Sequence, residues 1–404
     1  MKRRLLPMMM TLVLVCALPI WAAFVTSGDV TNPLVSTAWA TLPDLQAKID
    51  AAADNATITL DSNTEIAATL QITKNLTLDL NGCTLRMTGT GSVLKVSGRA
   101  TLTITDSSAA KSGTITGGNA EYGGGVYVDD YAALKMTGGC ITGCHASRGG
   151  GGIYSSGNLY MGGTAKIEKC TGSDDAIWNR ENSDIYADGG TVDGTVNNQG
   201  TIKRSEGAAA VTVFNGTVYN RSAGTIIAGI YNGTVENNGT ISGGTFCGGV
   251  TIRKGSWVWE RTGSISGGTF YSSIVNEAGP ERVTGVTFAV TFDRGDGTKT
   301  EPTPVKYNDL VPKPTAPTKS GYTFTGWEDA NGAYDFNTPV TGPLTLTARW
   351  EEVPSSGGYY YYPTTDTKAD DAKGSPKTAD PGVALYAALS LLSLTGLTCT
   401  AKKR

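Results

Sequence analysis

Acidic and basic side chains that recur at the interval of a longer repeat are the first candidates for chemistry in this chain of 404 residues. The glycine-rich run GGGVYV at 123–128 returns as GGGGIY at 149–154, and this shift defines the interval. One interval separates Asp174 and Asp175 from the neighbourhood of Arg148, whereas the positions one interval beyond Asp129 and Asp130 hold no acid. Two acids at matching positions of neighbouring strands would lie ~4.8 Å apart, close to the ~5 to 5.5 Å that a retaining glycosidase needs. A surface ion pair explains Arg148, Asp174 and Asp175 more simply, so we predict no catalytic residue.

The residue types in the sequence give little support for a nucleophilic triad or a metal site. The chain has one histidine, His145, which gives little basis for a Ser-His-Asp arrangement. Cys140, Cys144 and His145 approach a metal-ligand spacing, but a second ligand pair is missing. We therefore predict no metal and no cofactor. Cys144 and Cys170 are one interval apart, so a disulfide or stacked buried thiols would fit; we favour thiols, because cysteine packs as a small core residue.

A further kind of chemistry concerns the tail, where a short motif precedes an apolar run and a basic end. The motif consists of Ser375, Pro376, Lys377, Thr378 and Ala379. It resembles the sorting signal of Gram-positive sortase substrates, with Ser375 and Ala379 in place of the usual leucine and glycine. The resemblance implies that a sortase cysteine attacks the carbonyl carbon of Thr378 and that an amine of the peptidoglycan cross-bridge resolves the acyl-enzyme. A simple membrane anchor is the alternative.

Both ends of the chain carry apolar segments. Residues 383–400 would reach about 27 Å as a helix, which nearly spans ~30 Å of hydrocarbon, and the basic residues 402–404 would stay in the cytoplasm. Residues 1–23 combine a basic start, an apolar run and small residues, as in an export signal; an uncleaved anchor is the alternative. We predict an exported chain that a sorting signal at 375–404 holds in the membrane before processing.

The elements that must position these residues come from a recurring Gly-Thr unit that is followed by a β-branched or aromatic residue. The unit begins at Gly113, Gly194, Gly200, Gly216, Gly224, Gly233, Gly239, Gly244 and Gly268. Each copy reads as a turn and a strand too short to bury its own apolar face, so neighbouring copies must stack. The longer period also brings Leu134-Lys135-Met136 back as Leu159-Tyr160-Met161. We predict an all-β, right-handed parallel β-helix, a solenoid, over 41–287. A sandwich or propeller of hairpins is the alternative, but it needs longer alternating strands.

A short helix is predicted before the first coil. Leu42, Leu45, Ile49 and Ala52 share one helical face, and Pro43 stands near the first turn, where its missing N–H costs little. Such a helix would cover backbone groups that the first strand leaves unpaired. A flexible leader is the alternative.

The first coils resemble those of right-handed β-helix proteins in the stretch LTLDLNG at 76–82. The resemblance implies that its three leucines point inward and that Asn81-Gly82 makes the turn. Farther on, asparagine pairs at 197–198 and 237–238 precede Gly-Thr-Ile at similar places. These asparagines either stack to satisfy buried turn carbonyls or simply form turns.

Residues 288–350 mark a change in composition, with the segments AVTFDRGDG, VPKPTAPTKSGYTFTGW and YDFNTPVTGPLTLTARW. They resemble closely the Listeria–Bacteroides, or internalin B-type, repeat of bacterial surface proteins. The matching positions are Val290, Phe292, Gly297, Pro314, Pro317, Gly321, Tyr322, Phe324, Gly326, Trp327, Phe336, Pro339, Val340, Leu346 and Trp350. The family implies a small β-grasp-like domain that serves as a spacer or interaction unit. Tyr322, Phe324, Trp327 and Trp350 should form its core, and 351–374 should be a disordered linker.

The net charge of −3 gives no basic face for nucleic acid. The predicted protein is a surface protein of a Gram-positive bacterium, anchored to the cell wall, with sortase, the cross-bridge amine and the membrane as partners during anchoring. Its expected role is adhesion to a host glycan or matrix protein, without enzymatic activity. The alternative is a β-helix polysaccharide lyase or glycoside hydrolase displayed on the surface.

Overall fold

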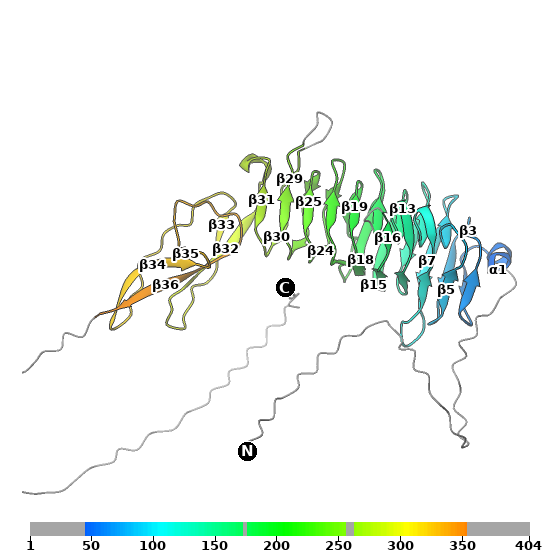
Figure 1. The fold of residues 1–404 in the computed structure, drawn as a ribbon, viewed down its shortest axis with the longest axis horizontal. Coiled ribbons are helices and arrows are strands. Elements are labelled where there is room, and N and C mark those ends of the chain that lie inside the picture. The colour runs from blue at the N-terminus through cyan, green and yellow to red at the C-terminus, as the bar shows by residue number, and fades with distance from the viewer. Residues whose placement is uncertain (1–44, 173–175, 256–261, 354–404) are drawn as a thin grey trace, which may run out of the picture.

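Short parallel strands wind into a rod of successive coils that ends in a small β domain (Figure 1). The computed structural model describes residues 45–172, 176–255 and 262–353. Paired strands of neighbouring coils run parallel, as in the pairs that join β1 to β4 and β10 to β14. The predicted all-β solenoid followed by a small β domain is therefore confirmed, and hairpin-built sandwiches and propellers are excluded for the rod.

Each coil presents three faces, and the strands of one face stack along the rod. The first face consists of β1 (Ala56–Thr59), β4 (Leu76–Asp79), β7 (Thr101–Thr105), β11 (Ala133–Met136), β15 (Asn158–Glu168), β18 (Asp184–Asp193), β20 (Thr201–Lys203), β23 (Thr225–Ile226), β26 (Thr240–Ile241) and β29 (Ser264–Ile265). The long strands β15 and β18 continue into the second face, so both faces belong to one sheet.

The other two faces are built in the same way. The second face consists of β2 (Thr64–Ile66), β5 (Thr84–Met87), β8 (Thr114–Thr116), β12 (Cys140–Thr142), β21 (Val213–Phe214), β24 (Ile230–Tyr231), β27 (Thr245–Phe246) and β30 (Thr269–Phe270), with the ends of β15 and β18 between β12 and β21. The third face consists of β3 (Leu70–Ile72), β6 (Leu94–Val96), β10 (Val126–Val128), β14 (Ile153–Ser155), β17 (Ile177–Asn179), β19 (Val196–Asn198), β22 (Val218–Asn220), β25 (Val235–Asn237), β28 (Val250–Ile252) and β31 (Ile274–Asn276). The middle coils add β9 (Asn119–Tyr122), β13 (His145–Gly149) and β16 (Thr171–Gly172).

The strand register confirms the predicted long period. Leu134 on β11 pairs with Leu159 on β15, and both side chains are buried. The three leucines of 76–80 are also buried, as expected for inward-pointing residues. Asn81 and Gly82 have φ angles of 44° and 76°, a left-handed conformation that asparagine and glycine adopt most readily, so this dipeptide forms the predicted turn.

Helix α1 (Leu45–Ala51) covers the N-terminal end of the rod beside β3. Leu45 and Ile49 are buried against the first coil. The amide nitrogen of Gln71 donates a hydrogen bond of 2.7 Å to Oε1 of Gln46, and Lys74 Nζ donates to the carbonyl oxygen of Asp50 at 2.7 Å. The helix thus supplies both apolar cover and hydrogen-bond partners at the first coil of the sheet.

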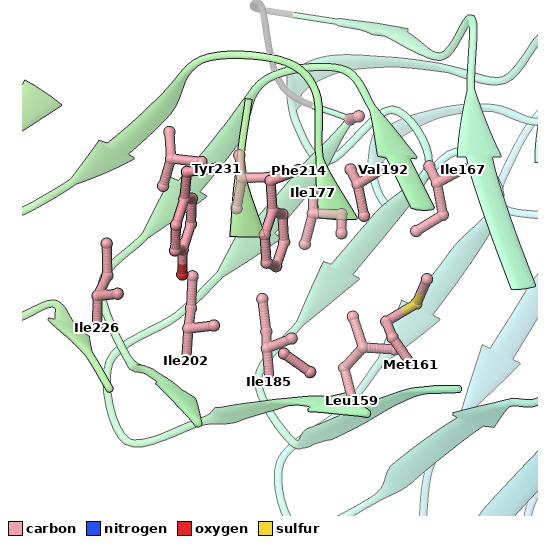
Figure 2. Close-up of a cluster of buried hydrophobic side chains, with 14 of the residues drawn as sticks. Leu159, Met161, Ile167, Ile177, Ile185, Val192, Ile202, Phe214, Ile226 and Tyr231 are labelled. Atoms are coloured by element: carbon pink, nitrogen blue, oxygen red, sulfur yellow. The ribbon is translucent and has the colours of Figure 1, made fainter. Parts of the chain in front are cut away.

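The interior of the second face changes from aliphatic to aromatic residues along the rod (Figure 2). Ile167 and Val192 precede Phe214 in register. From there on, rings stack nearly parallel, with successive centroids 5.0, 4.9 and 4.7 Å apart, in the order Phe214, Tyr231, Phe246 and Phe270. We call these four residues the aromatic ladder. Each ring buries its faces against its neighbours, so the ladder both fills the core and fixes the coil spacing.

A second ladder, of buried asparagines, lies on the interior side of the third face. It consists of Asn179, Asn198, Asn220 and Asn237. The Nδ2 of each residue donates to the Oδ1 of the next, at 2.8, 2.8 and 2.7 Å. Nδ2 of Asn198 also donates to the turn carbonyl of Gly200 at 3.0 Å. The stacked interpretation is therefore correct: Asn198 pairs with Asn220 and Asn220 pairs with Asn237, so Asn198 and Asn237 share one position of the coil.

The C-terminal domain is a five-stranded mixed sheet. Its strands are β32 (Thr287–Asp293), β33 (Thr303–Lys306), β34 (Tyr322–Asp329), β35 (Gly332–Ala333) and β36 (Leu344–Glu352), in the order β33-β32-β36-β34-β35. Trp327 is buried, with ring centroids 4.9 Å from Phe292 and 5.4 Å from Phe324. Phe324 and Trp350 are partly buried and pack against this core. The predicted core role of Trp327 is confirmed, whereas Tyr322 lies outside this core, and its hydroxyl donates to Oε1 of Glu352 at 3.1 Å.

This domain docks on the last coil of the rod. The short 3-10 helix η1 (Pro280–Arg282) leads into β32, where Phe288 packs edge-on against Phe270, the end of the aromatic ladder, at 6.4 Å. The amide of Ile274 on β31 donates to the carbonyl oxygen of Thr341 at 2.8 Å. The domain therefore covers the C-terminal end of the rod, as α1 covers the other end.

Cys144 and Cys170 occupy neighbouring coils, directly before the paired residues His145 and Thr171. Both are free thiols. A hydrogen bond with Cys144, together with burial, raises the pKa of Cys170. The structure agrees with stacked thiols rather than a disulfide.

Candidate functional site

Of the predicted candidate residues Arg148, Asp174 and Asp175, the structure describes Arg148. Arg148 lies on β13, and its Nε is 2.9 Å from Oε1 of Glu121 on the neighbouring strand β9. Both side chains are more than half exposed. Asp174 and Asp175 lie outside the described residues. Arg148 thus takes part in a surface ion pair, with Glu121 as the acid, in line with the simpler explanation of this residue.

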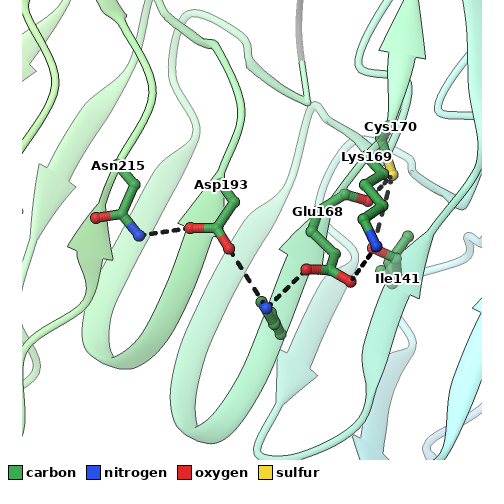
Figure 3. A network of polar contacts seen from close by, with 7 residues as sticks. Ile141, Glu168, Lys169, Cys170, Asp193 and Asn215 are labelled. Carbon is green, nitrogen blue, oxygen red and sulfur yellow. Dashed lines mark hydrogen bonds and ion pairs between the residues drawn. The ribbon is translucent and has the colours of Figure 1, made fainter. Parts of the chain in front are cut away.

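An acid pair in register occurs elsewhere in the rod. Glu168 on β15 and Asp193 on β18 pair across neighbouring coils (Figure 3). Lys166 Nζ lies 2.6 Å from Glu168 and 3.4 Å from Asp193, and its hydrogen bond to Glu168 raises the pKa of Lys166. The two acids are one coil apart, so the interval of the longer repeat could have revealed them, although sequence reasoning applied it to other acids. The shared ammonium makes this group an ion-pair network rather than a free acid and base.

Outward aromatic residues form two rows, but their ring faces are already occupied. Tyr127 and Tyr154 stack on the third face with centroids 5.1 Å apart, and Lys95 lies over Tyr127. Tyr160 and Tyr186 stack on the first face at 4.2 Å. A sugar that binds an aromatic residue uses an open ring face, so these rows stabilise coil stacking rather than present a flat platform.

A groove lies on the outer side of the third face of the described rod. It has a volume of about 380 Å³, within the usual range for small-molecule sites. Its lining spans the coils that carry β22, β25, β28 and β31. The lining residues, which we call the polar groove, are Tyr219, Arg221, Glu236, Asn238, Arg253, Lys254 and Glu277.

The strand register brings these side chains together from four successive coils. Tyr219 and Glu236 are the outward central residues of β22 and β25 and pair in register. Arg221, Asn238 and Arg253 each follow directly after a strand, and their amides donate to carbonyl oxygens of the preceding coil at 2.8, 2.8 and 2.9 Å. Successive coils lie ~4.8 Å apart, so two rows of polar side chains run along the rod and enclose the groove.

Ion pairs hold one side of the polar groove. Arg253 Nε is 2.5 Å from Oε2 of Glu236, and Nη1 is 2.7 Å from Oε1 of Glu277. Arg221 instead donates from Nε to Oδ1 of Asn197 at 3.1 Å, and its guanidinium lies 4.9 Å from the ring centre of Tyr219. The hydrogen bond with Glu236 raises the pKa of Arg253. The groove therefore combines a compensated arginine with a second one that stacks on a ring.

Sequence reasoning missed the polar groove because it aligned the coils on their Gly-Thr units. Alignment on the buried aliphatic residue of the third face would have shown a short recurring unit: VYNR, VENN, VTIR and IVNE, beginning at positions 218, 235, 250 and 274. In the first two copies the first and third residues are buried, while the second is partly exposed and points outward. That pattern was available in the sequence.

The predicted sorting motif with Thr378, the export signal and the span at 383–400 all lie outside the described residues. Within residues 45–172, 176–255 and 262–353, no helix is long and apolar enough to cross a membrane.

Comparison with known proteins identifies the C-terminal domain. Residues 288–349 match the Listeria-Bacteroides repeat domain. A Gly-rich membrane protein of Evansella cellulosilytica, described as putative, is 34% identical over 68 residues, which are 16% of this chain. The chain covers 8% of the length of that relative, so the likeness concerns a small part of it. The repeat that the sequence predicted is thus confirmed over 288–349, and such a repeat indicates a surface-associated protein.

Proposed function

We propose that this chain is an exported surface protein of a Gram-positive bacterium, linked covalently to the cell wall and displaying its β-helix for adhesion to a glycan or matrix protein. The observation that carries the proposal is the Listeria-Bacteroides repeat at 288–349, between the rod and the C-terminal tail. The repeat covers the last coil, so display on a stalk would leave the sides of the rod open to a partner.

Anchoring would proceed through Thr378. A sortase thiolate attacks the carbonyl carbon of Thr378, the bond to Ala379 breaks, and the amino group of Ala379 leaves with the proton that the sortase thiol gave up. An amine of the peptidoglycan cross-bridge then attacks the thioester, which releases the thiolate and forms a new amide. The apolar run 383–400 and the basic residues 402–404 would hold the chain at the membrane until the first step is complete.

Adhesion fits the charged surfaces of the rod better than hydrolysis does. Both carboxylates of the polar groove contact the guanidinium of Arg253, and both acids of the Glu168–Asp193 pair share Lys166. A glycosidase needs one carboxylic acid to donate a proton and one carboxylate to attack or activate water. Paired carboxylates supply hydrogen-bond acceptors for recognition instead.

Cell fractionation tests the anchoring. Cell walls are digested with a muramidase, and the protein is followed in wall, membrane and medium fractions for the parent and for Thr378→Ala. We expect the variant to be lost from the wall fraction and retained in the membrane, whereas Thr367→Ala, in the linker, should behave as the parent. Wall-linked Thr378→Ala protein at the parental level would contradict covalent anchoring and favour a simple membrane anchor.

A further inference from the structure

The polar groove carries an excess of positive charge over its carboxylates. Arg221, Arg253 and Lys254 face two carboxylates, Glu236 and Glu277. Within the described residues, both ion pairs of the groove involve Arg253. Arg221 and Lys254 therefore supply positive charge that the groove carboxylates leave uncompensated, and an anionic group is the natural counterpart.

The rest of the lining suits a ligand with many hydroxyl groups. Glu236 and Glu277 accept hydrogen bonds, Asn238 both donates and accepts, and Tyr219 adds a ring. A ligand without hydroxyl groups would leave the two carboxylates without donors, whereas the hydroxyl groups of a sugar would donate to them. The groove also runs along the rod, with matching outward positions on each coil about every 4.8 Å, which suits a linear polymer.

We propose that the polar groove binds an acidic saccharide, with a sugar carboxylate at Arg221 and Lys254 and sugar hydroxyls at Glu236, Asn238 and Glu277. The proposal rests on the proposed adhesive function and names its ligand class and its residues. Arg253 is a positioning residue, because its two ion pairs orient the carboxylates that accept from the hydroxyls.

Binding of a galacturonate trimer tests the proposal, with its methyl ester as the matched ligand in which each carboxylate is a neutral ester. Affinity is measured by calorimetry on the full chain, purified in detergent. We expect the ester to bind the parent at least about tenfold more weakly, since charge-assisted hydrogen bonds are lost. Affinity for the acid should also fall as salt is added. Equal binding of acid and ester, or binding of neither, would overturn the proposal without the use of any variant.

Two variants then locate the site. Arg221→Gln with Lys254→Gln replaces both cations by neutral polar side chains and should lower the affinity for the acid about tenfold while leaving the ester unaffected. Lys135→Gln, an exposed cation on the first face, is the control and should bind as the parent. If the double variant binds the acid as tightly as the parent does, the site lies elsewhere. Cell fractionation tests anchoring independently of saccharide binding. A wrong ligand for the polar groove and a wrong anchoring mechanism are therefore distinguishable.

Discussion

The N-terminal and C-terminal coils of the same rod differ in the number of residues per coil. On the third face, Leu94 pairs with Val126, and Val126 pairs with Ile153 in the next coil. Toward the other end, Val218 pairs with Val235, and Val235 pairs with Val250. One coil there contains little more than half as many residues as one of the N-terminal coils. The long coils place their extra residues in wide turns and in the added strands β9, β13 and β16, whereas the short coils have tight corners.

The composition of the interior follows from that difference. The early coils are filled with aliphatic residues such as Leu102 and Ile104, which pack without fixed direction. The short coils leave turn carbonyls near the core, and the asparagine ladder satisfies them, while the aromatic ladder fills the second face. Directional contacts dominate the C-terminal coils. We therefore expect the loss of one side chain to lower stability more in these coils than in the N-terminal coils.

The largest effect is expected in the aromatic ladder. Phe246→Ala removes a fully buried ring that stacks on both sides and should lower the free energy of unfolding by ~3 to 5 kcal/mol, measured in urea. Phe246→Leu retains most of the apolar volume and should be clearly less destabilising. An alanine variant within about 1 kcal/mol of the parent would show that the ring is not packed as described.

A somewhat smaller loss is expected in the asparagine ladder. Asn220→Ala removes one acceptor of Nδ2 of Asn198 and the donor to Oδ1 of Asn237, so the free energy of unfolding should fall by about 2 kcal/mol. The control is Asn215→Ala, an asparagine in the same coil whose hydrogen bonds with Asp193 and Asn232 are exposed to solvent. Equal denaturation midpoints for the two variants would remove the distinction between ladder and surface asparagines.

The N-terminal coils offer a pH-dependent contrast at Asp106. Burial raises the pKa of Asp106, but hydrogen bonds from the hydroxyl of Ser108 and the amides of Gly113 and Gly82 outweigh it, so the pKa lies below the usual value. A depressed pKa stabilises the fold above the unfolded value near ~3.9, and that contribution is lost as the pH falls through the folded value.

The Asp106→Asn variant should therefore have a lower melting temperature than the parent at pH 7. This difference in melting temperature, the gap, should shrink as the pH is lowered from about 4 toward 3. Thermal unfolding followed by circular dichroism at pH 7, 4 and 3 measures the gap. Asp130→Asn, at an exposed position, is the control. A gap that stays constant over this range would mean that ionisation of Asp106 does not support its turn.

The smallest effect is expected at Arg148, which first suggested chemistry, and at Asp193 of the acid pair on β15 and β18. The parent should leave a panel of acidic and neutral polysaccharides uncleaved, and Arg148→Ala and Asp193→Asn should behave in the same way. Reducing-end release and unsaturated-product absorbance measure hydrolase and lyase activity. Activity in the parent that disappears in Arg148→Ala, Asp174→Ala or Asp175→Ala would establish the enzyme alternative.

Several features were predictable because they depend on local residue types. Asn81-Gly82 forms its turn because both residues tolerate positive φ, and the leucines of 76–80 alternate as a strand requires. Trp327 is core because a domain of this size has few large apolar residues. The Cys144–Cys170 stack followed from the regular interval between the middle coils.

The amino-acid sequence by itself determined the coil architecture, since a turn followed by a short apolar strand cannot bury its face without a neighbouring copy, and it determined the repeat at 288–349 through its motif. The tertiary structure decided which outward side chains meet. The coil length varies, so no constant interval identifies the partners, and register is set by the interior residues that stack. That register joins Arg148 to Glu121, places Asn198 in line with Asn237, and brings Arg221 and Lys254 into one groove.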